Sequence, residues 1–406
     1  MLDVTGTFLP TPLPGTAAAF RRLVGMRPWR ARMAELAKRA RAGQRGGRAL
    51  QQRHALELAI DRQANGTAPA CHAERLVAGM AQELVATYPR LSPHGQARLR
   101  ERLQASLTGD ATMAPLLHLF RTAALQRGRG FNVCHAGLED GAPHDLLITR
   151  QGIEAELACD TISAEEGRDV QRSAWTDLMD MVDPDLQTWL AAHPGRYLLK
   201  MTLPQGLRAD RAGLAQLHGR IRNMLAEQRR ADHDEAAVLR LDPLLLAGAQ
   251  MADRVSADKG LVGSLRQEFG AEANLAVTTS GGGVFVLAAR AVRADEVAVA
   301  IRKRLAAIAP LRLSGTRPGI LSMFIEDTDR TEWRALRERL ELEGETRQFL
   351  AHPSSRAVVA VACASRLELL GAPAPDAAPG GEMRFRNPAH PAAKSAELAP
   401  AVLSSV

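Results

Sequence analysis

The sequence predicts an α/β protein with a helical N-terminal region, an αβββα core and an α/β C-terminal region. Three observations predict this class. Apolar residues recur at helical spacing before residue 127, short alternating strands follow between residues 131 and 159, and strands then alternate with helices up to residue 362. The 406 residues are enough for two or three domains. With 46% hydrophobic and 24% charged residues, the composition excludes a wholly disordered chain.

Changes in composition and periodicity divide the chain into five segments. These are a basic, poorly ordered arm (1–49), a helical region (50–127), a core (128–205), an α/β C-terminal region (206–370) and a Pro/Ala-rich tail (371–406). In the helical region, Ser92-Pro93 has the form of a helix start, and Met113–Gln126 is a second helix that ends before Gly128.

The core begins where the periodicity changes from helix to strand. We expect strands at Phe131–Ala136, His144–Thr149 and Ile153–Cys159, with a tight turn at Arg150-Gln151-Gly152 between the last two. Ser163-Ala164-Glu165-Glu166 has the form of a capping box, so a helix is expected to start there. Together with the helix before the first strand, these elements give the αβββα order.

The C-terminal half alternates between strands and helices. The expected strands are Arg196–Leu203, Ala236–Leu241, Leu275–Thr279, Val284–Ala289, Ile320–Ile325 and Ala357–Ala362. The expected helices are Leu214–Leu225, Asp295–Ile308 and Glu332–Leu342. Ser280-Gly281-Gly282-Gly283 joins two strands and no helix follows it, so it is a hairpin turn rather than a phosphate-binding loop.

The net charge of +7 is concentrated at the N-terminus. Residues 1–53 hold eleven Arg and Lys against Asp3 and Glu35, a net charge of +9, which leaves −2 for the rest. A basic arm on a nearly neutral body is typical of polyanion binding, so DNA is the expected partner of the arm. An arginine-rich helix without a nucleic-acid partner is the alternative interpretation.

Acidic residues gather on the second and third strands of the core. Asp145 lies at the start of one strand, and Glu154, Glu156 and Asp160 alternate along the next, so they share a face. Carboxylates this close repel one another and favour a shared divalent cation, for which Asp145, Glu154 and Glu156 are the candidate ligands. The alternative is the solvated face of an ordinary edge strand.

The run from Gly130 to Arg172 resembles the core of the PD-(D/E)xK nuclease superfamily. It is most similar to bacterial members in which the third strand ends in E-x-K followed by Thr-Ile-Ser and a Gly-Arg pair. The matching residues here are Thr161-Ile162-Ser163 and Gly167-Arg168, and Pro143 with Asp145 matches the first half of the motif with one residue inserted. The resemblance implies a metal-dependent phosphodiesterase core in about a tenth of the chain.

The expected lysine is missing in every register of this motif. The register set by Thr161-Ile162-Ser163 puts Ala158 in the glutamate position and Asp160 in the lysine position. A shift by two residues puts Glu156 and Ala158 there, and a further shift gives Glu154-Ala155-Glu156. Arg168 or Arg172 would then have to stabilise charge on the phosphate, although arginine is a poor proton acceptor.

The resemblance implies a nucleic-acid-binding or nucleic-acid-processing protein with a degenerate nuclease core. If the site is active, Asp145 and Glu156 are expected to hold Mg²⁺, with Glu154 or Asp160 as a third acid. The alternative is a catalytically inactive scaffold that acts as a protein-interaction module. A Mg²⁺-dependent nuclease and an inactive core both remain open from the sequence.

Other sequence features favour a cytoplasmic protein that does not enter a membrane. No apolar run reaches the roughly 18 residues of a membrane span, and the N-terminus lacks a basic start followed by an apolar block. Four widely spaced cysteines, Cys71, Cys134, Cys159 and Cys363, have neither metal-ligand spacing nor a disulfide pattern. These features fit a reducing compartment.

Overall fold

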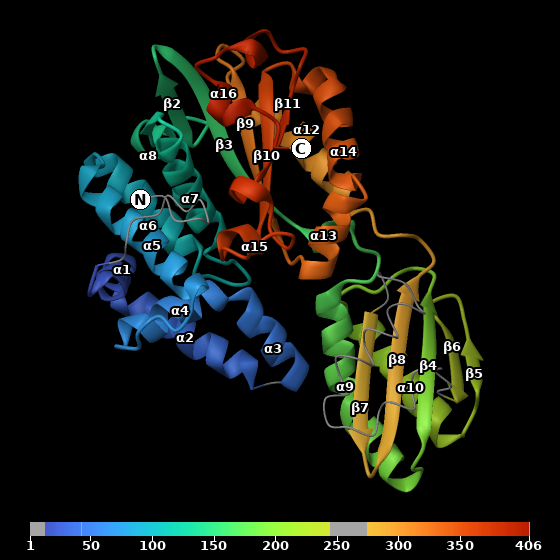
Figure 1. Ribbon diagram of the computed structural model, residues 1–406. Helices are drawn as coiled ribbons and strands as arrows, with labels where there is room; N and C mark the ends of the chain where they lie inside the picture. Colours follow the sequence, from blue (N-terminus) through green and yellow to red (C-terminus); the bar gives the residue numbers. More distant parts are fainter. Residues whose placement is uncertain (1–12, 42, 244–273, 406) are drawn as a thin grey trace. The chain divides into compact units, whose positions relative to one another are not determined.

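The chain divides into two compact units, one inserted into the other. The computed structural model describes residues 13–41, 43–243 and 274–405 (Figure 1). Unit 1 consists of residues 1–37, 51–166 and 297–406, and unit 2 consists of residues 38–50 and 167–296. The predicted α/β class with a helical N-terminal region is confirmed. Among the helices described, none is both long and apolar enough to cross a membrane.

The N-terminal part of unit 1 is a helical layer. Its helices are α1 (Thr16–Val24), α2 (Met26–Ala40), α4 (Ala55–Ala64), α5 (His72–Thr87), α6 (Pro93–Ala105) and α7 (Ala114–Gly128), with the 3₁₀ turn η1 (Tyr88–Arg90). The predicted start of α6 is confirmed, because the Ser92 hydroxyl accepts a hydrogen bond from the Gly95 N–H at 3.1 Å and Pro93 follows the cap. Phe20, Trp29 and Phe120 are fully buried in the shared core.

A six-stranded mixed sheet is the centre of unit 1. Its strands are β1 (Asn132–Cys134), β2 (Leu146–Arg150), β3 (Ile153–Ser163), β9 (Gly319–Glu326), β10 (Val358–Ser365) and β11 (Met383–Arg386), in the order β1-β2-β3-β9-β10-β11. The first three pair antiparallel, β9 and β10 join parallel to β3, and β11 closes the sheet antiparallel. All eight residues of β10 are buried, as is typical of a strand inside a parallel arrangement.

Helices cover both faces of this sheet (Figure 1). The side chains of α7 pack on one face together with α16 (Ala399–Val402). The other face packs against α12 (Val297–Arg312), α13 (Arg330–Glu338) and α14 (Glu341–Ala351). A single helix was predicted over Glu332–Leu342, but the chain breaks at Leu340, where φ is +59°. The short helices α8 (Ala136–Glu139) and α15 (Arg366–Leu369) complete the unit.

The turn between β2 and β3 is as predicted. Gln151 and Gly152 have φ values of +50° and +83°, and Arg150 pairs with Ile153 on either side of them. Two consecutive positive φ values define the two-residue turn that matches the twist of a hairpin. This turn fixes the register of the hairpin and therefore which carboxylates share a face.

The predicted capping box at Ser163 is wrong. Ser163 is the last residue of β3, and its hydroxyl donates a hydrogen bond to the Asp327 carboxylate at 2.6 Å. A 3₁₀ turn, η2 (Ala164–Gly167), follows, and the long helix α9 (Arg172–Ala192) starts only after it. The parallel pairing with β9 continues as far as Ser163 and Glu326, so the sheet extends through the residues that were expected to begin a helix.

The C-terminal segment is part of the sheet, so the prediction of a Pro/Ala-rich tail is wrong. Strand β11 pairs with β10, and its Met383 and Phe385 are buried. The buried Glu382 carboxylate accepts a hydrogen bond from Arg129 at the end of α7, at 2.7 Å. The 3₁₀ turn η4 (Pro353–Ser355) precedes β10, and η5 (Pro379–Gly381) and η6 (Pro391–Lys394) each begin with one of the six prolines of residues 371–406.

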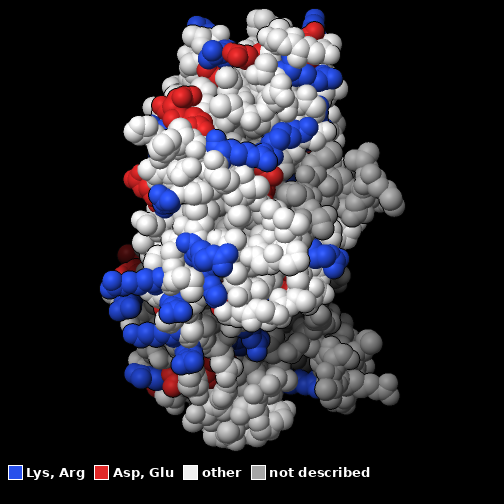
Figure 2. All heavy atoms as spheres, turned by 90° about the vertical axis from the view of Figure 1, so that its left-hand side faces the viewer, with Lys and Arg blue, Asp and Glu red and all other residues white. Residues whose placement is uncertain are grey.

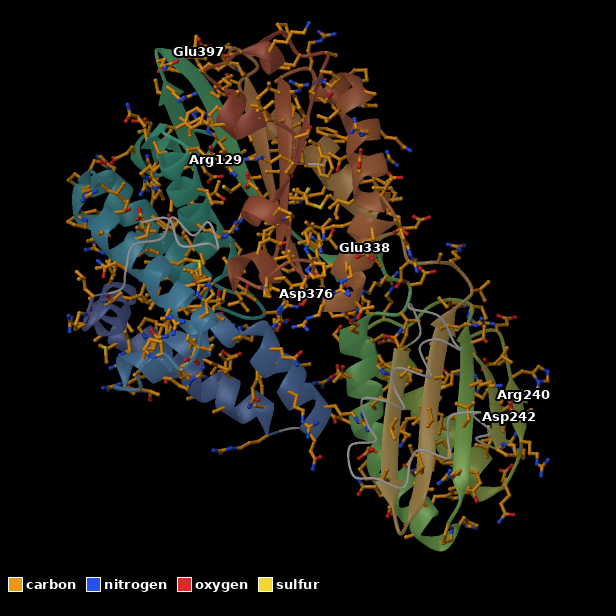
Figure 3. All side chains as sticks on the ribbon, in the orientation of Figure 1. Arg129, Arg240, Asp242, Glu338, Asp376 and Glu397 are labelled. Atoms are coloured by element: carbon orange, nitrogen blue, oxygen red, sulfur yellow. The ribbon has the colours of Figure 1, made fainter. Side chains whose placement is uncertain are left out.

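Unit 2 is a five-stranded sheet covered on one face by two helices. The strands are β4 (Arg196–Leu203), β5 (Ala231–His233), β6 (Val238–Pro243), β7 (Asn274–Ser280) and β8 (Gly283–Ala291), in the order β5-β6-β4-β8-β7. Helices α9 and α10 (Arg211–Ala226) pack on the face with Leu199, Met201 and Phe285. Gly281 and Gly282 both have positive φ between β7 and β8, which confirms the hairpin turn. On β6, Arg240 and Asp242 form an ion pair (Figure 3).

The prediction of a poorly ordered arm is wrong for its described residues, which form α1, α2 and α3 (Gln44–Arg53). The glycine-rich stretch does not merely interrupt a helix. The Asp180 carboxylate on α9 accepts hydrogen bonds from the N–H groups of Arg45 and Gly46, at 3.0 and 2.8 Å. A Cβ at Gly43 would collide with that carboxylate, so glycine is required there. Asp180 therefore caps α3 and holds it in unit 2.

Replacing Asp180 by alanine is expected to loosen α3. The variant loses a charged cap, which costs about 1 kcal/mol. Amide hydrogen exchange should accelerate in residues 44–50, and the strands of unit 2 should keep their protection. Asp185→Ala on the same helix is the control, because Asp185 pairs with His218 of α10. Unchanged exchange in residues 44–50 of the Asp180 variant would contradict the capping role.

Candidate functional site

The predicted site lies where β2 begins and β3 continues beyond it. Leu146, the first residue of β2, pairs with Leu157, whereas β3 runs on to Ser163. Asp145 spans the end of this pairing. Its N–H donates to the Leu157 carbonyl at 3.1 Å, and its carboxylate accepts from the Cys159 N–H at 2.8 Å. These two hydrogen bonds hold Asp145 against the part of β3 that extends beyond the end of β2.

Three of the predicted acidic residues share one face of β3. Glu154, Glu156 and Asp160 alternate along this strand and therefore point to the same side. Asp145 lies in the bend before β2, beyond the last pair Leu146 and Leu157, and is placed by its own hydrogen bonds to Leu157 and Cys159.

Asp145 is buried between two arginines from distant parts of the chain. Arg102 on α6 contacts Asp145 Oδ1 at 3.0 Å, and Arg312 at the end of α12 contacts Oδ2 at 2.6 Å. Arg312 also donates to the Pro143 carbonyl at 2.6 Å. Asp145 is 4% exposed, whereas the Arg102 and Arg312 side chains are 39% and 28% exposed. The three groups carry a net charge of +1 at the surface.

Glu156 is held by the segment that follows α12. Its side chain is fully buried, and the Ser314 N–H and hydroxyl donate to its two oxygens at 2.7 and 2.6 Å. His144 and Arg317 lie 3.8 and 3.7 Å from Glu156 Oε1. Arg317 also pairs with Glu154 at 2.8 Å. Both carboxylates are therefore satisfied by hydrogen bonds and positive charge.

Asp160, in the lysine position of one register, is paired with another arginine of α12. Arg304 approaches it with two nitrogens, at 2.6 and 3.1 Å. The hydrogen bonds to Asp160 raise the pKa of the Arg304 guanidinium. A cation is thus present beside Asp160, and it is paired with that carboxylate.

These acids do not fit a divalent cation. Residues 13–41, 43–243 and 274–405 contain no group of three His, Cys, Asp or Glu side chains arranged to hold a metal. Arginine or serine donors contact all four predicted carboxylates instead, those of Asp145, Glu154, Glu156 and Asp160. The residues present therefore do not match the expected Mg²⁺ site.

The two arginines expected to stabilise a phosphate belong to unit 2. Arg168 is buried, at 2% exposure, and Arg172 is the first residue of α9. The arginines that contact the acidic residues are instead Arg102, Arg304, Arg312 and Arg317, all in unit 1. The structure therefore gives the acids of unit 1 arginine partners that the sequence analysis did not name.

A pocket of about 480 Å³ opens beside Asp145. Its polar lining includes Arg102, His118, Asp145, Asp160 and Arg312, and its apolar lining comes mainly from α6 and α7. Its volume is in the range of ~300–1,000 Å³ that is typical of ligand pockets. The pocket combines exposed guanidinium groups with an apolar wall.

The pKa values of two residues that line the pocket, His118 and Cys159, are strongly shifted. Burial, together with the charge of Arg121, lowers the pKa of His118 to about 4, so its imidazole is neutral at pH 7. Burial also raises the pKa of the Cys159 thiol well above its usual value. Cys159 is therefore a thiol rather than a nucleophilic thiolate at neutral pH.

No known family matches this chain, and neither the curated proteins nor the solved structures contain a significant match.

Ser314→Ala is expected to destabilise the protein by about 1–2 kcal/mol, because the buried Glu156 loses a hydroxyl donor. Urea unfolding at pH 7 measures this as a lower midpoint with an unchanged slope. Ser354→Ala, on an exposed turn beside His352, is the control. Equal midpoints for both variants would contradict the role assigned to Ser314.

Proposed function

We propose that the protein binds nucleic acid through a nuclease-like core of the PD-(D/E)xK type in which arginine–carboxylate pairs occupy the positions of the metal site. In this proposal the core binds a phosphodiester without cleaving it. The observation that carries the proposal is Asp145 between Arg102 and Arg312 at the mouth of a pocket. Guanidinium groups bind phosphate oxygens with paired hydrogen bonds, which suits them to this role.

The order of the strands supports the nuclease-like part of the proposal. Three antiparallel strands, β1 to β3, are followed after α12 by β9, which is parallel to β3. Helix α7 and strands β1 to β3 agree with the first part of the expected αβββα order. The helix predicted to close that order is α9 of unit 2, and α12 takes its place in unit 1.

Basic surface outside the pocket supports nucleic acid as the ligand. Eight of the eleven basic residues in the first 53 are exposed: Arg22, Arg27, Arg30, Lys38, Arg39, Arg41, Arg48 and Arg53. Helix α6 adds Arg98 and Arg100 near Arg102. Figure 2 shows Lys and Arg side chains in several patches on one face of the molecule. Such charge attracts a polyanion and makes its binding dependent on salt.

A cleavage assay tests the proposal against active catalysis. Plasmid and single-stranded DNA are incubated with Mg²⁺ or Mn²⁺ and wild type, Asp145→Ala or Glu156→Ala, and binding is measured in parallel by fluorescence anisotropy. We expect binding of DNA by the wild type and equal, background-level cleavage in all three. Cleavage by the wild type that both variants lose would show a working metal site and overturn the proposal. Absence of DNA binding would also overturn it and favour the protein-interaction module.

A further inference from the structure

The pocket beside Asp145 has two chemically different parts. At one end, Arg102 and Arg312 present guanidinium groups that are partly exposed. A guanidinium has five N–H donors, so the contact with Asp145 occupies only part of the capacity of each arginine. Elsewhere the wall is apolar and includes Pro115, Leu116 and Leu119 of α7. A ligand that fits both parts has an anionic group joined to a largely apolar body.

The imidazole of His118 lies behind this lining. Its Nε2 is 3.2 Å from both the carbonyl and the hydroxyl of Ser322, so Nε2 is paired in either tautomer. Nδ1 is buried and has no hydrogen-bond partner among the described residues. His118 therefore contributes a neutral ring to the wall of the pocket rather than a charge.

We infer that the pocket receives one unpaired nucleotide, with its phosphate on Arg102 and Arg312 and its base against the α7 wall. A nucleotide combines the anion and the apolar face that the two parts of the lining favour. A base stacked and paired inside a duplex cannot enter such a pocket without leaving the stack. The inference rests on the proposed function and narrows it to single strands, strand ends and other unpaired nucleotides.

Small-molecule binding tests the pocket directly. Calorimetric titrations compare dAMP, deoxyadenosine and inorganic phosphate as ligands of the full-length protein. We expect dAMP to bind at least tenfold more tightly than either of the other two, because only dAMP occupies both parts of the pocket. Inorganic phosphate that binds as tightly as dAMP would reduce the site to a plain anion site and overturn the inference.

Filling the pocket gives a matched pair of variants. Ala105 is exposed at the end of α6 and lines the pocket, whereas Ala97 is exposed on the same helix and does not line it. Ala105→Trp is expected to lower dAMP and single-stranded DNA affinity at least tenfold, and Ala97→Trp to leave both unchanged. Ala111→Trp, which fills the pocket from the loop before α7, repeats the test if the Ala105 variant fails to fold.

The outcomes separate this inference from the proposed function. Binding of dAMP that Ala105→Trp abolishes, without binding of any DNA, supports the nucleotide pocket and overturns the proposed function. The opposite result is equal affinity for single-stranded and double-stranded DNA that Ala105→Trp does not change, together with no binding of dAMP. That result overturns the nucleotide pocket and leaves the proposed function standing.

Discussion

Replacing both Arg102 and Arg312 by glutamine is expected to lower the affinity for single-stranded DNA about 100-fold. Each guanidinium is assigned one phosphate contact, and charged hydrogen bonds contribute roughly 1.5 kcal/mol each, which together is about two decades of affinity. The dependence of log affinity on log salt should also flatten by roughly 0.7, since both arginines contact the same phosphate and each phosphate neutralised on a single strand contributes about 0.7. Fluorescence anisotropy at several salt concentrations measures both quantities.

The control for this prediction separates binding from folding. Arg347→Gln removes an exposed arginine that pairs with Glu343 on α14, away from the pocket, and should change the affinity little. The double variant leaves Asp145 buried without its two cations, so a triple variant that adds Asp145→Asn restores a neutral site. We expect the triple variant to fold like the wild type and to bind as weakly as the double variant. Wild-type affinity in the triple variant would contradict the role of the arginines.

Acid is expected to destabilise unit 1 through two buried histidines. Burial, together with the charge of Arg121 for His118 and of Arg127 for His135, lowers both pKa values to about 4. Between pH 6.5 and 4 the unfolded chain therefore binds two protons that the folded chain does not. The stabilisation is complete above pH 6.5 and is lost as the pH falls toward 4, with about 3 kcal/mol for each histidine.

The contribution of each histidine can be measured from the slope of the free energy of unfolding against pH. In the window from pH 6.5 to 5, the free energy of unfolding should change by about 1.4 kcal/mol per pH unit for each histidine. His118→Gln and His135→Gln should each remove one such contribution, whatever their effect on absolute stability. Urea unfolding at intervals of half a pH unit measures the slopes. Identical slopes in the wild type and both variants would show that neither histidine is held neutral.

The ionisation of Glu326, at the end of β9, has the opposite effect on the pH dependence of stability. Burial, followed by the charge of Asp327, raises its pKa to about 7. Between pH 4.5 and 7 the folded chain holds a proton that the unfolded chain has lost, so this contribution is present at low pH and lost as the pH rises through 7. Stability is therefore expected to peak near pH 6.5, above the range of the histidines and below the ionisation of Glu326.

Local periodicity was sufficient to predict most strands. It did not predict which contacts order the N-terminal and C-terminal segments. Strand β4 spans the predicted residues Arg196–Leu203, and the turn at Gln151-Gly152 follows from two residues that accept positive φ. The arm and the tail were mispredicted because composition alone was used. Their order depends on partners far away in sequence, namely Asp180 for α3 and β10 for β11.

The candidate site was predictable only where it depends on the strand period. The shared face of Glu154, Glu156 and Asp160 follows from alternation along one strand, and all three lie in β3. No local sequence pattern identifies the arginines that pair with these carboxylates. Arg102 lies 43 residues before Asp145, and Arg312 lies 167 residues after it. Tertiary packing of α6 and α12 brings these arginines to the carboxylate, so a metal site was the natural expectation from the acids alone.

The affinity for single-stranded DNA with and without a divalent cation tests the central claim most directly. Anisotropy titrations of the wild type are carried out in EDTA and in Mg²⁺ at matched ionic strength, with the DNA recovered afterwards to check that it is intact. If arginines rather than a metal hold the phosphate, the two affinities should agree and the DNA should be uncut. Binding that appears only with Mg²⁺ and disappears in Asp145→Ala would contradict it.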